Sequence, residues 1–288
     1  MSNIANAPSP PLLRQELAQR LFFLLVALGA ILFAYHHVLS GMIKDWYLDE
    51  NSSHGFIVPV VTAYLIWKRR SVLIDLPIKP NVWGLFLLLA GIGLLLLGWV
   101  ATEYFTMRFS LIVVLCGCIT YCFGWPVLSA IAGPMAYLIL MIPIPAILYD
   151  AAAFPLKLFV TQVSVSFMKA IGIMVVRDGN VMAFPNITLE VVNACSGLRS
   201  LTSLLAVGLA YVMLVVKVRW QKAVLIALIF PIALAANMVR VIGTGILAQY
   251  YGAAAAEGFF HEFAGLVIFM ASIIMLTVAH GILSRVSR

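Results

Sequence analysis

Cys195 stands where a polar segment gives way to a long apolar run, and it is well placed to act as a nucleophile. Ser196 and Gly197 follow it, and Arg199 comes one turn later. The apolar run Leu201–Val216 is long enough for a membrane helix, so the cysteine is expected at a helix N-terminus near the lipid boundary. The partial positive charge and free N–H groups there favour a thiolate and a developing oxyanion. The alternative is a small apolar residue that packs at a helix start.

Two further residues have the chemistry to complete a site for acyl transfer. Arg240 falls within an apolar run, with Asn237 one turn before it. An arginine in a membrane span costs about 2.5–3.5 kcal/mol, which makes it a functional-site candidate, although it can also snorkel to the head groups. His261 opens the last apolar run and can exchange a proton near neutral pH, or form an ordinary interfacial pair with Glu262. With Cys195 these residues would supply a nucleophile, a cation and an acid–base group.

The composition indicates a polytopic membrane protein. Of the 288 residues, 64% are hydrophobic and only 10% are charged, whereas a soluble domain carries about 25% charged residues. The net charge of +7 does not indicate nucleic acid binding, because Lys and Arg gather at the ends of apolar runs as cytoplasmic anchors do. Cys116, Cys118 and Cys122 share one apolar run without a His or carboxylate, so we expect core packing there and neither a metal nor a cofactor.

The apolar runs and the Lys/Arg bias predict an all-α bundle of about eight transmembrane helices with both termini in the cytoplasm. Residues 1–20 are expected to be a disordered cytoplasmic tail, and residues 21–285 a single transmembrane domain. The prolines of Met141–Pro145 are expected to kink or end the fifth span. The predicted spans are Leu21–Ser40, His54–Trp67, Val82–Val100, Phe105–Cys122, Val127–Tyr149, Ser196–Val216, Ala223–Ile242, and a last one from Phe259 or Phe260 that finishes before Arg285.

Residues 152–176 are apolar but interrupted by polar side chains. If they crossed the membrane, the basic cluster of residues 217–222 would fall outside, against the charge bias. We therefore expect an amphipathic helix on the outer leaflet or in the outer mouth of the protein. Residues 177–189 carry Gly179, Pro185 and alternating side chains, which favours a short extended loop or hairpin on the outer side.

This topology brings residues from three separate spans toward the outer face. Cys195, Arg240 and His261 all fall near outer ends of their spans. His54 is expected at the outer mouth of the second span, as a solvated interfacial residue rather than in a direct catalytic role. The sequence therefore predicts one pocket that opens away from the cytosol.

Four segments resemble the exosortase/archaeosortase family of membrane transpeptidases. They follow the family's order and are Ser53–Phe56, Asn193–Arg199, Asn237–Val241 and His261–Gly265, and the Ala-Cys-Ser-Gly-Leu-Arg block is the most specific. The resemblance implies that Cys195 is the acyl-enzyme nucleophile, completed by Arg240 and His261. The supporting or substrate-binding residues would be Asn193, Ser196, Gly197, Arg199, Asn237 and His54.

The resemblance also implies substrates and a location. The substrates would be exported proteins whose C-terminal tail has a short Pro-Glu-Pro-type motif, one membrane span and a basic end. Cleavage would occur on the outer face of a bacterial cytoplasmic membrane, among its lipids, with release or transfer to a surface polymer or another amine acceptor. In Gram-negative bacteria such systems accompany exopolysaccharide production.

Three other functions fit the same residues. The first is a membrane cysteine protease that only hydrolyses its substrate. The second is a transporter or channel, because polar residues in spans also mark these proteins, although repeat symmetry or paired broken helices are then more usual. The third is a non-catalytic assembly scaffold, in which Cys195 would be expendable.

Overall fold

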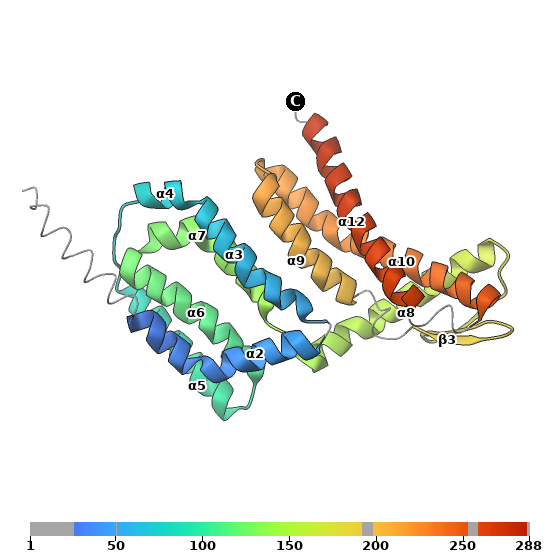
Figure 1. Cartoon of the computed structure of the whole chain (residues 1–288), viewed down its shortest axis with the longest axis horizontal. Coiled ribbons are helices and arrows are strands. Elements are labelled where there is room, and N and C mark those ends of the chain that lie inside the picture. The colour runs from blue at the N-terminus through green and yellow to red at the C-terminus, as the bar shows by residue number, and fades with distance from the viewer. Residues whose placement is uncertain (1–25, 50, 192–197, 253–258, 287–288) are drawn as a thin grey trace, which may run out of the picture.

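The structure is a computed structural model that describes residues 26–49, 51–191, 198–252 and 259–286. Its helices pack side by side, and one small sheet lies near the C-terminal helices (Figure 1). The helices are Val26–Ala34, α2 (His36–Leu48), η1 (Ser53–Phe56), α3 (Ile57–Lys68), α4 (Arg70–Asp75), α5 (Trp83–Val100), α6 (Tyr104–Phe123), α7 (Trp125–Tyr137), η2 (Leu138–Met141), α8 (Ala146–Ala170), α9 (Leu198–Val215), α10 (Arg219–Tyr251) and α12 (Phe259–Val286).

Five of the described helices are long and apolar enough to cross a membrane, which supports the prediction of an all-α polytopic membrane protein. They are α5, α6, α8, α10 and residues Gly265–Val286 of α12. The bent pair Val26–Ala34 and α2 would make a sixth span. The predicted number of eight is not reached by this measure, because α3, α7 and α9 are shorter. The predicted disordered tail, residues 1–20, lies outside the described residues.

The predicted end of the first span at Ser40 is wrong, and the helix is also bent. The helix bends by 63° at Tyr35 and continues to Leu48. Tyr35 is buried, and its hydroxyl shares a 2.9 Å hydrogen bond with Ser110 Oγ on α6. Further along α2, Asp45 pairs with Arg108 of α6 at 2.5 Å. Contacts with a helix distant in the sequence therefore hold α2 in its direction.

Glycines allow α5 and α6 to pack closely. Gly84, Gly91 and Gly98 recur every seven residues and are the buried residues of α5. A Cβ at Gly91 would lie 2.9 Å from the main-chain nitrogen of Val114 on α6. Small residues let membrane helices approach in this way and gain van der Waals contact. The Glu103 carboxylate then caps α6 by accepting hydrogen bonds from the N–H groups that follow it, at 2.9 and 2.6 Å.

The fifth predicted span ends earlier than expected, although the predicted break at its prolines is confirmed. The chain runs through α7 and η2 and then leaves helical structure at Ile142. Pro145 precedes α8, so Tyr149 belongs to the next helix and not to this span. Proline lacks an N–H group and fixes φ, which suits the residue before a helix better than its interior.

A helix was predicted over residues 152–176, and α8 occupies Ala146–Ala170. This helix is long and apolar enough to cross a membrane, whereas we predicted an amphipathic helix that does not cross it. In Figure 1 it runs across the direction of α9 and α12. The extended segment that follows is confirmed and has a third strand. The strands β1 (Val176–Asp178), β2 (Val181–Ala183) and β3 (Thr188–Glu190) pair antiparallel in that order.

The predicted end of the seventh span at Ile242 is wrong. The helix α10 continues through Gly243 and Gly245 to Tyr251 and ends before Gly252, whose φ is 83°. A Cβ at Gly245 would lie 3.2 Å from the side chains of Met168 and Phe184. Close packing against α8 and the sheet therefore outweighs the low helix propensity of glycine.

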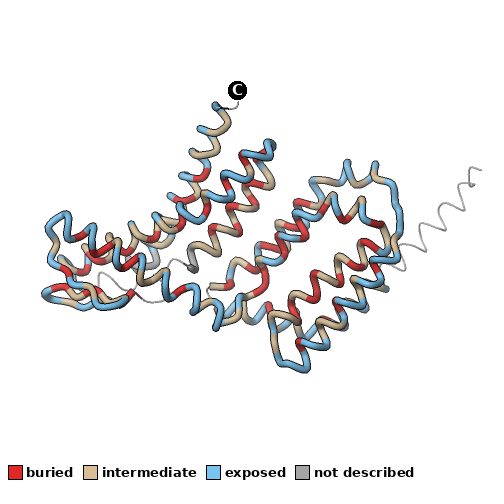
Figure 2. The backbone as a smooth tube through the Cα atoms, turned by 180° about the vertical axis from the view of Figure 1, so that it is seen from behind, coloured by how far each residue is buried: buried red, intermediate tan, exposed pale blue. Residues whose placement is uncertain are grey.

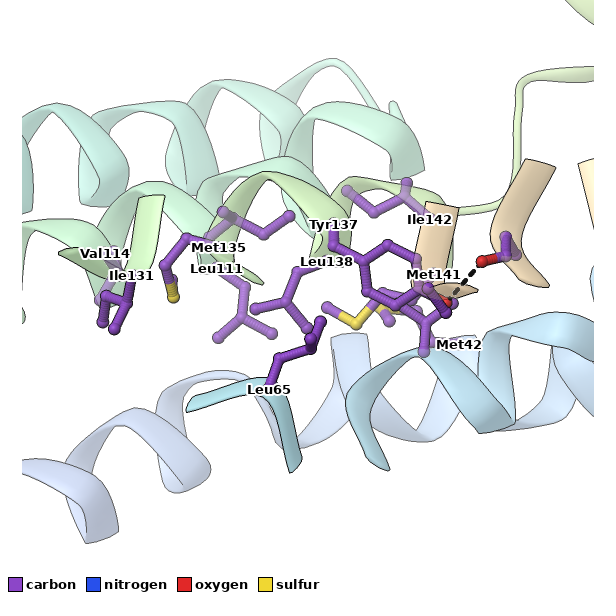
Figure 3. Close-up of a cluster of buried hydrophobic side chains, with 14 of the residues drawn as sticks. Met42, Leu65, Leu111, Val114, Ile131, Met135, Tyr137, Leu138, Met141 and Ile142 are labelled. Carbon is purple, nitrogen blue, oxygen red and sulfur yellow. Dashed lines mark hydrogen bonds between the residues drawn. The ribbon is translucent and has the colours of Figure 1, made fainter. Parts of the chain in front are cut away.

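The helix α9 lies between two hydrophobic clusters. Ala206 and Ala210 belong to the N-terminal cluster, which Figure 3 shows around Met42, Leu65 and Met135, and the Tyr137 hydroxyl donates to the Ala206 carbonyl at 2.9 Å. Leu204 and Val212 belong to the cluster shared with α10 and α12. Figure 2 shows buried positions along the facing sides of both groups of helices. A third cluster joins α8 and the sheet to α10.

Candidate active site

The predicted site residues fall into two sets in the structure. Asn193, Cys195, Ser196 and Gly197 lie outside the described residues. The others are placed on helices at least by their backbone: His54 in η1, Arg199 in the first turn of α9, Asn237 and Arg240 in α10, and His261 in the first turn of α12.

Arg240 and His261 come from different helices that meet at one interface. A Cβ at Gly265 of α12 would lie 3.8 Å from Cζ and from Nη1 of Arg240, so the guanidinium rests against this glycine. Position 261 is four residues before Gly265, and residues four apart share a helix face. The guanidinium of Arg240 therefore lies one helical turn along α12 from position 261, and the convergence of the two side chains stays a prediction.

Asn237 belongs to the buried side of α10. Its exposed fraction is 1%, and it lies in one buried row with Val241 and Gly245, spaced by four residues. Arg240 is half-buried one turn after Asn237. A buried amide or guanidinium is costly unless it is hydrogen-bonded, and both residues have polar or ring contacts with neighbouring groups. Asn237 and Arg240 are thus part of the packed side of α10 and do not face lipid.

The start of α9 packs against the helices that carry Arg240 and His261. Leu198 is the first residue of α9. Leu201 and Leu204 pack in the cluster with α10 and α12. Cys195, three residues before Leu198, lies outside the described residues.

His54 forms part of a wall on the N-terminal side of α9. Its Nε2 donates to the Leu140 carbonyl at 3.1 Å, and Trp46 Nε1 donates to the Met141 carbonyl at 2.8 Å. A Cβ at Gly55 would overlap the Trp46 indole, so the glycine is needed for this contact. Burial lowers the pKa of His54 below its ordinary value, although hydrogen bonds to main-chain groups oppose the shift. His54 is therefore better described as a supporting residue of this wall than as a solvated interfacial residue.

A cavity of about 550 Å³ opens beside this wall. It is lined by the segment between α2 and α3, by the η2–α8 junction, and by Thr202 and Leu205 of α9. Asp49 and Asp150 are the acidic residues of its described lining. The sequence did not predict this cavity, because no local pattern relates lining residues that are so far apart along the chain.

The three clustered cysteines behave as packing residues. Cys116 and Cys118 pack against the N-terminal hydrophobic cluster, and these two and Cys122 are half-buried free thiols in α6. Core packing, as expected, accounts for them.

Comparison with known proteins gives one match. The family model described as transmembrane exosortase (Exosortase_EpsH) matches residues 46–278. Neither the curated proteins nor the solved structures contain a match to this chain. The matched range contains every residue assigned above to the candidate site.

Proposed function

Since this chain belongs to the transmembrane exosortase family, we propose that it is a membrane cysteine transpeptidase that cleaves the C-terminal tail of exported proteins. The tail would carry a short Pro-Glu-Pro-type motif, one membrane span and a basic end. The observation that carries the proposal is the contact of the Arg240 guanidinium with α12 at Gly265, one turn from position 261. This contact supports a cation and an imidazole beside the start of α9, which Cys195 precedes by three residues.

In the first step, the Cys195 thiolate attacks the carbonyl carbon of the scissile peptide bond. The C–S bond forms, the C–N bond breaks, and the leaving amine takes a proton from the His261 imidazolium. Arginine does not act as a base in proteins, so the role of Arg240 is to stabilise the thiolate and the oxyanion. The product is a thioester between the exported protein and Cys195.

In the second step, an acceptor amine attacks the thioester. A C–N bond forms, the C–S bond breaks, and its electron pair returns to the sulfur as a thiolate. The proton lost by the attacking nitrogen goes to His261, which restores the starting state. Water in place of the amine gives hydrolysis by the same route, and this is the nearest alternative function.

The proposal includes a location. The candidate spans among the described helices make this a multi-pass membrane protein. We place it in the cytoplasmic membrane of a bacterium with the cysteine on the outer side, where exported substrates pass. A surface polymer is then an accessible acceptor, in keeping with exopolysaccharide production.

The direct test is tail removal from a co-expressed reporter that ends in the three-part tail. Cys195→Ala should leave the reporter uncleaved, and Arg240→Gln and His261→Gln should each lower the cleavage rate by about 10²-fold or more. Cys116→Ala, which removes a thiol from the N-terminal cluster, is the matched control and should cleave normally. Normal cleavage by Cys195→Ala in membranes that contain the full-length variant would show that the nucleophile is another group.

A further inference from the structure

The strand β3 is an edge of the sheet, and its pairing with β2 fixes which of its main-chain groups face outward. The Val191 N–H donates to the Asn180 carbonyl at 2.9 Å. In an antiparallel pair, hydrogen-bonded residues alternate with residues whose N–H and C=O groups point away from the partner strand. Leu189, two residues before Val191, therefore faces β2 in the same way. Thr188 and Glu190 direct their main-chain N–H and C=O groups to the outer edge.

The outer edge of β3 is open in the part of the chain that the structure describes. No hydrogen bond joins the outward main-chain groups of Thr188 and Glu190 to another described residue, and both residues are exposed. Proteins usually protect such an edge with lysine, proline or a bulge, because it is a template for pairing with another chain. The pairing of β3 is regular, and its sequence Thr-Leu-Glu has neither lysine nor proline. Its own residues therefore do not prevent it from pairing with another extended chain.

The opposite edge strand, β1, is tied to the helices. Arg177 Nε donates to the Gly179 carbonyl at 2.8 Å, and Arg177 Nη1 donates to Gln162 Oε1 on α8 at 3.0 Å. The sheet is thus anchored to α8 along β1 and open along β3. A rigid sheet with one open edge is the arrangement by which proteins bind extended peptides as an added strand.

The sheet lies against the part of α10 that carries the candidate site. Leu189 of β3 shares a hydrophobic cluster with Met238 and Val241, which stand two residues before and one residue after Arg240. Figure 1 shows the sheet at the end of the helices where α12 begins. In the sequence, Cys195 follows the last residue of β3 by five positions. A peptide bound along this edge would be held beside the helix that supplies the candidate cation.

We propose that the edge of β3 binds the substrate as a fourth strand, by pairing with the extended segment that contains the scissile bond. The proposal rests on the proposed function for the identity of this segment. Antiparallel pairing with Thr188 and Glu190 uses two substrate residues that are two positions apart, through four main-chain hydrogen bonds. An extended segment leaves its other carbonyl groups accessible to a nucleophile, whereas a helix uses them in its own hydrogen bonds.

The Pro-Glu-Pro-type motif proposed for the tail is compatible with such an edge. Proline has no N–H group, so it suits an added strand only at positions that face away from the partner. The two prolines are two residues apart and therefore point to the same side of a strand. Both can face away from β3 while the residue between them faces toward it.

The first test measures binding without catalysis, on the full-length Cys195→Ala protein in detergent. The probe is a fluorescent synthetic peptide with the segment before the motif, the motif and the membrane span of the reporter tail, and microscale thermophoresis gives its affinity. Single N-methyl groups are placed at successive residues of the segment before the motif, because each one removes an N–H donor. Affinity should fall about fivefold at residues that face β3 and stay within about twofold at the residues between them.

The protein side of the pairing is tested with proline substitutions. Thr188→Pro removes an outward N–H and leaves the bonds between β2 and β3, which use the alternate residues. It should weaken binding of the unmethylated peptide about fivefold. Met174→Pro, at an exposed residue before β1, is the proline control and should bind within about twofold. The peptide scan needs no change in the sheet, so it decides the question if Thr188→Pro does not fold.

Equal affinities across the methylated peptides, or equal losses in Thr188→Pro and Met174→Pro, would overturn the proposal. Unchanged peptide binding by Thr188→Pro with an altered oligomeric size would also overturn it, because the edge would then belong to a second copy of the chain. Cleavage of the tailed reporter is followed separately in the protein that retains Cys195. Alternating affinities without cleavage would count against the proposed function and leave the edge assignment standing, and cleavage without alternation would do the reverse.

Discussion

A valine at position 265 should inactivate the protein by displacing Arg240. An ideal Cβ there lies 3.8 Å from Cζ and Nη1 of the guanidinium, so alanine makes only an ordinary contact. Valine adds two Cγ atoms about 1.5 Å beyond the Cβ, and they fill two of three staggered positions. A Cγ directed at the guanidinium would approach within about 2.3 Å, against about 3.5 Å for a normal contact. The guanidinium must then move by about 1 Å, which typically costs about 10²-fold in rate.

The assay is the initial rate of reporter cleavage at equal amounts of membrane-inserted protein. Gly265→Ala should retain the rate within about threefold, and Gly265→Val should lose about 10²-fold. Gly281→Val is the matched control on the same helix, because a Cβ there meets nothing within 4 Å. The reasoning fails if Gly265→Val cleaves like the wild type, or if alanine and valine at this position lose equally.

Three further predictions concern stability in detergent. Gly91→Ala should lower the free energy of unfolding by about 1–3 kcal/mol, because its Cβ would press on α6. Gly93→Ala is the control, because a Cβ there meets nothing within 4 Å, and it should be neutral or slightly stabilising. Thermal unfolding of the two variants provides the comparison. Gly55→Ala should displace the Trp46 indole and lower the melting temperature by about 5 °C, and tryptophan fluorescence should report the new environment. Burial lowers the pKa of His54, so the unfolded state takes up a proton before the folded state does as the pH falls. Stability should therefore fall as the pH drops below about 6.5 toward the pKa of His54 in the folded protein. His54→Gln keeps a donor for the Leu140 carbonyl and should make the melting temperature less dependent on pH between about pH 7 and 5.

Helices whose ends are fixed by residues nearby in the sequence were predictable. The third and fourth predicted spans agree with α5 and α6 to within one residue at each end. Glu103 caps α6 through its own side chain, and Gly124, with φ 90°, ends it. These signals act within a few residues, so a local pattern contains them.

Features that depend on distant contacts were not predictable. Tyr35, at the bend, shares a hydrogen bond with Ser110 of α6, and Gly245, within α10, packs against Met168 of α8 and Phe184. No local pattern contains either partner. Sequence spacing led to Arg240 and His261 as predicted site residues, but it did not indicate the cavity beside His54, whose lining comes from segments far apart in the chain.

The helix α9 has a different region of the candidate site on each of its two sides. On one side lies the Arg240–Gly265 contact, and on the other the cavity lined by Thr202. Changes at Gly265 should act on Arg240 and through it on cleavage, the first step of the proposed reaction. A change that shifts α9 itself should affect both steps, and Tyr137→Phe is such a change because it removes the hydrogen bond to the Ala206 carbonyl. Tyr137→Phe should therefore lower tail cleavage and attachment of an acceptor amine by the same factor, and unequal losses in the two assays would contradict this reasoning.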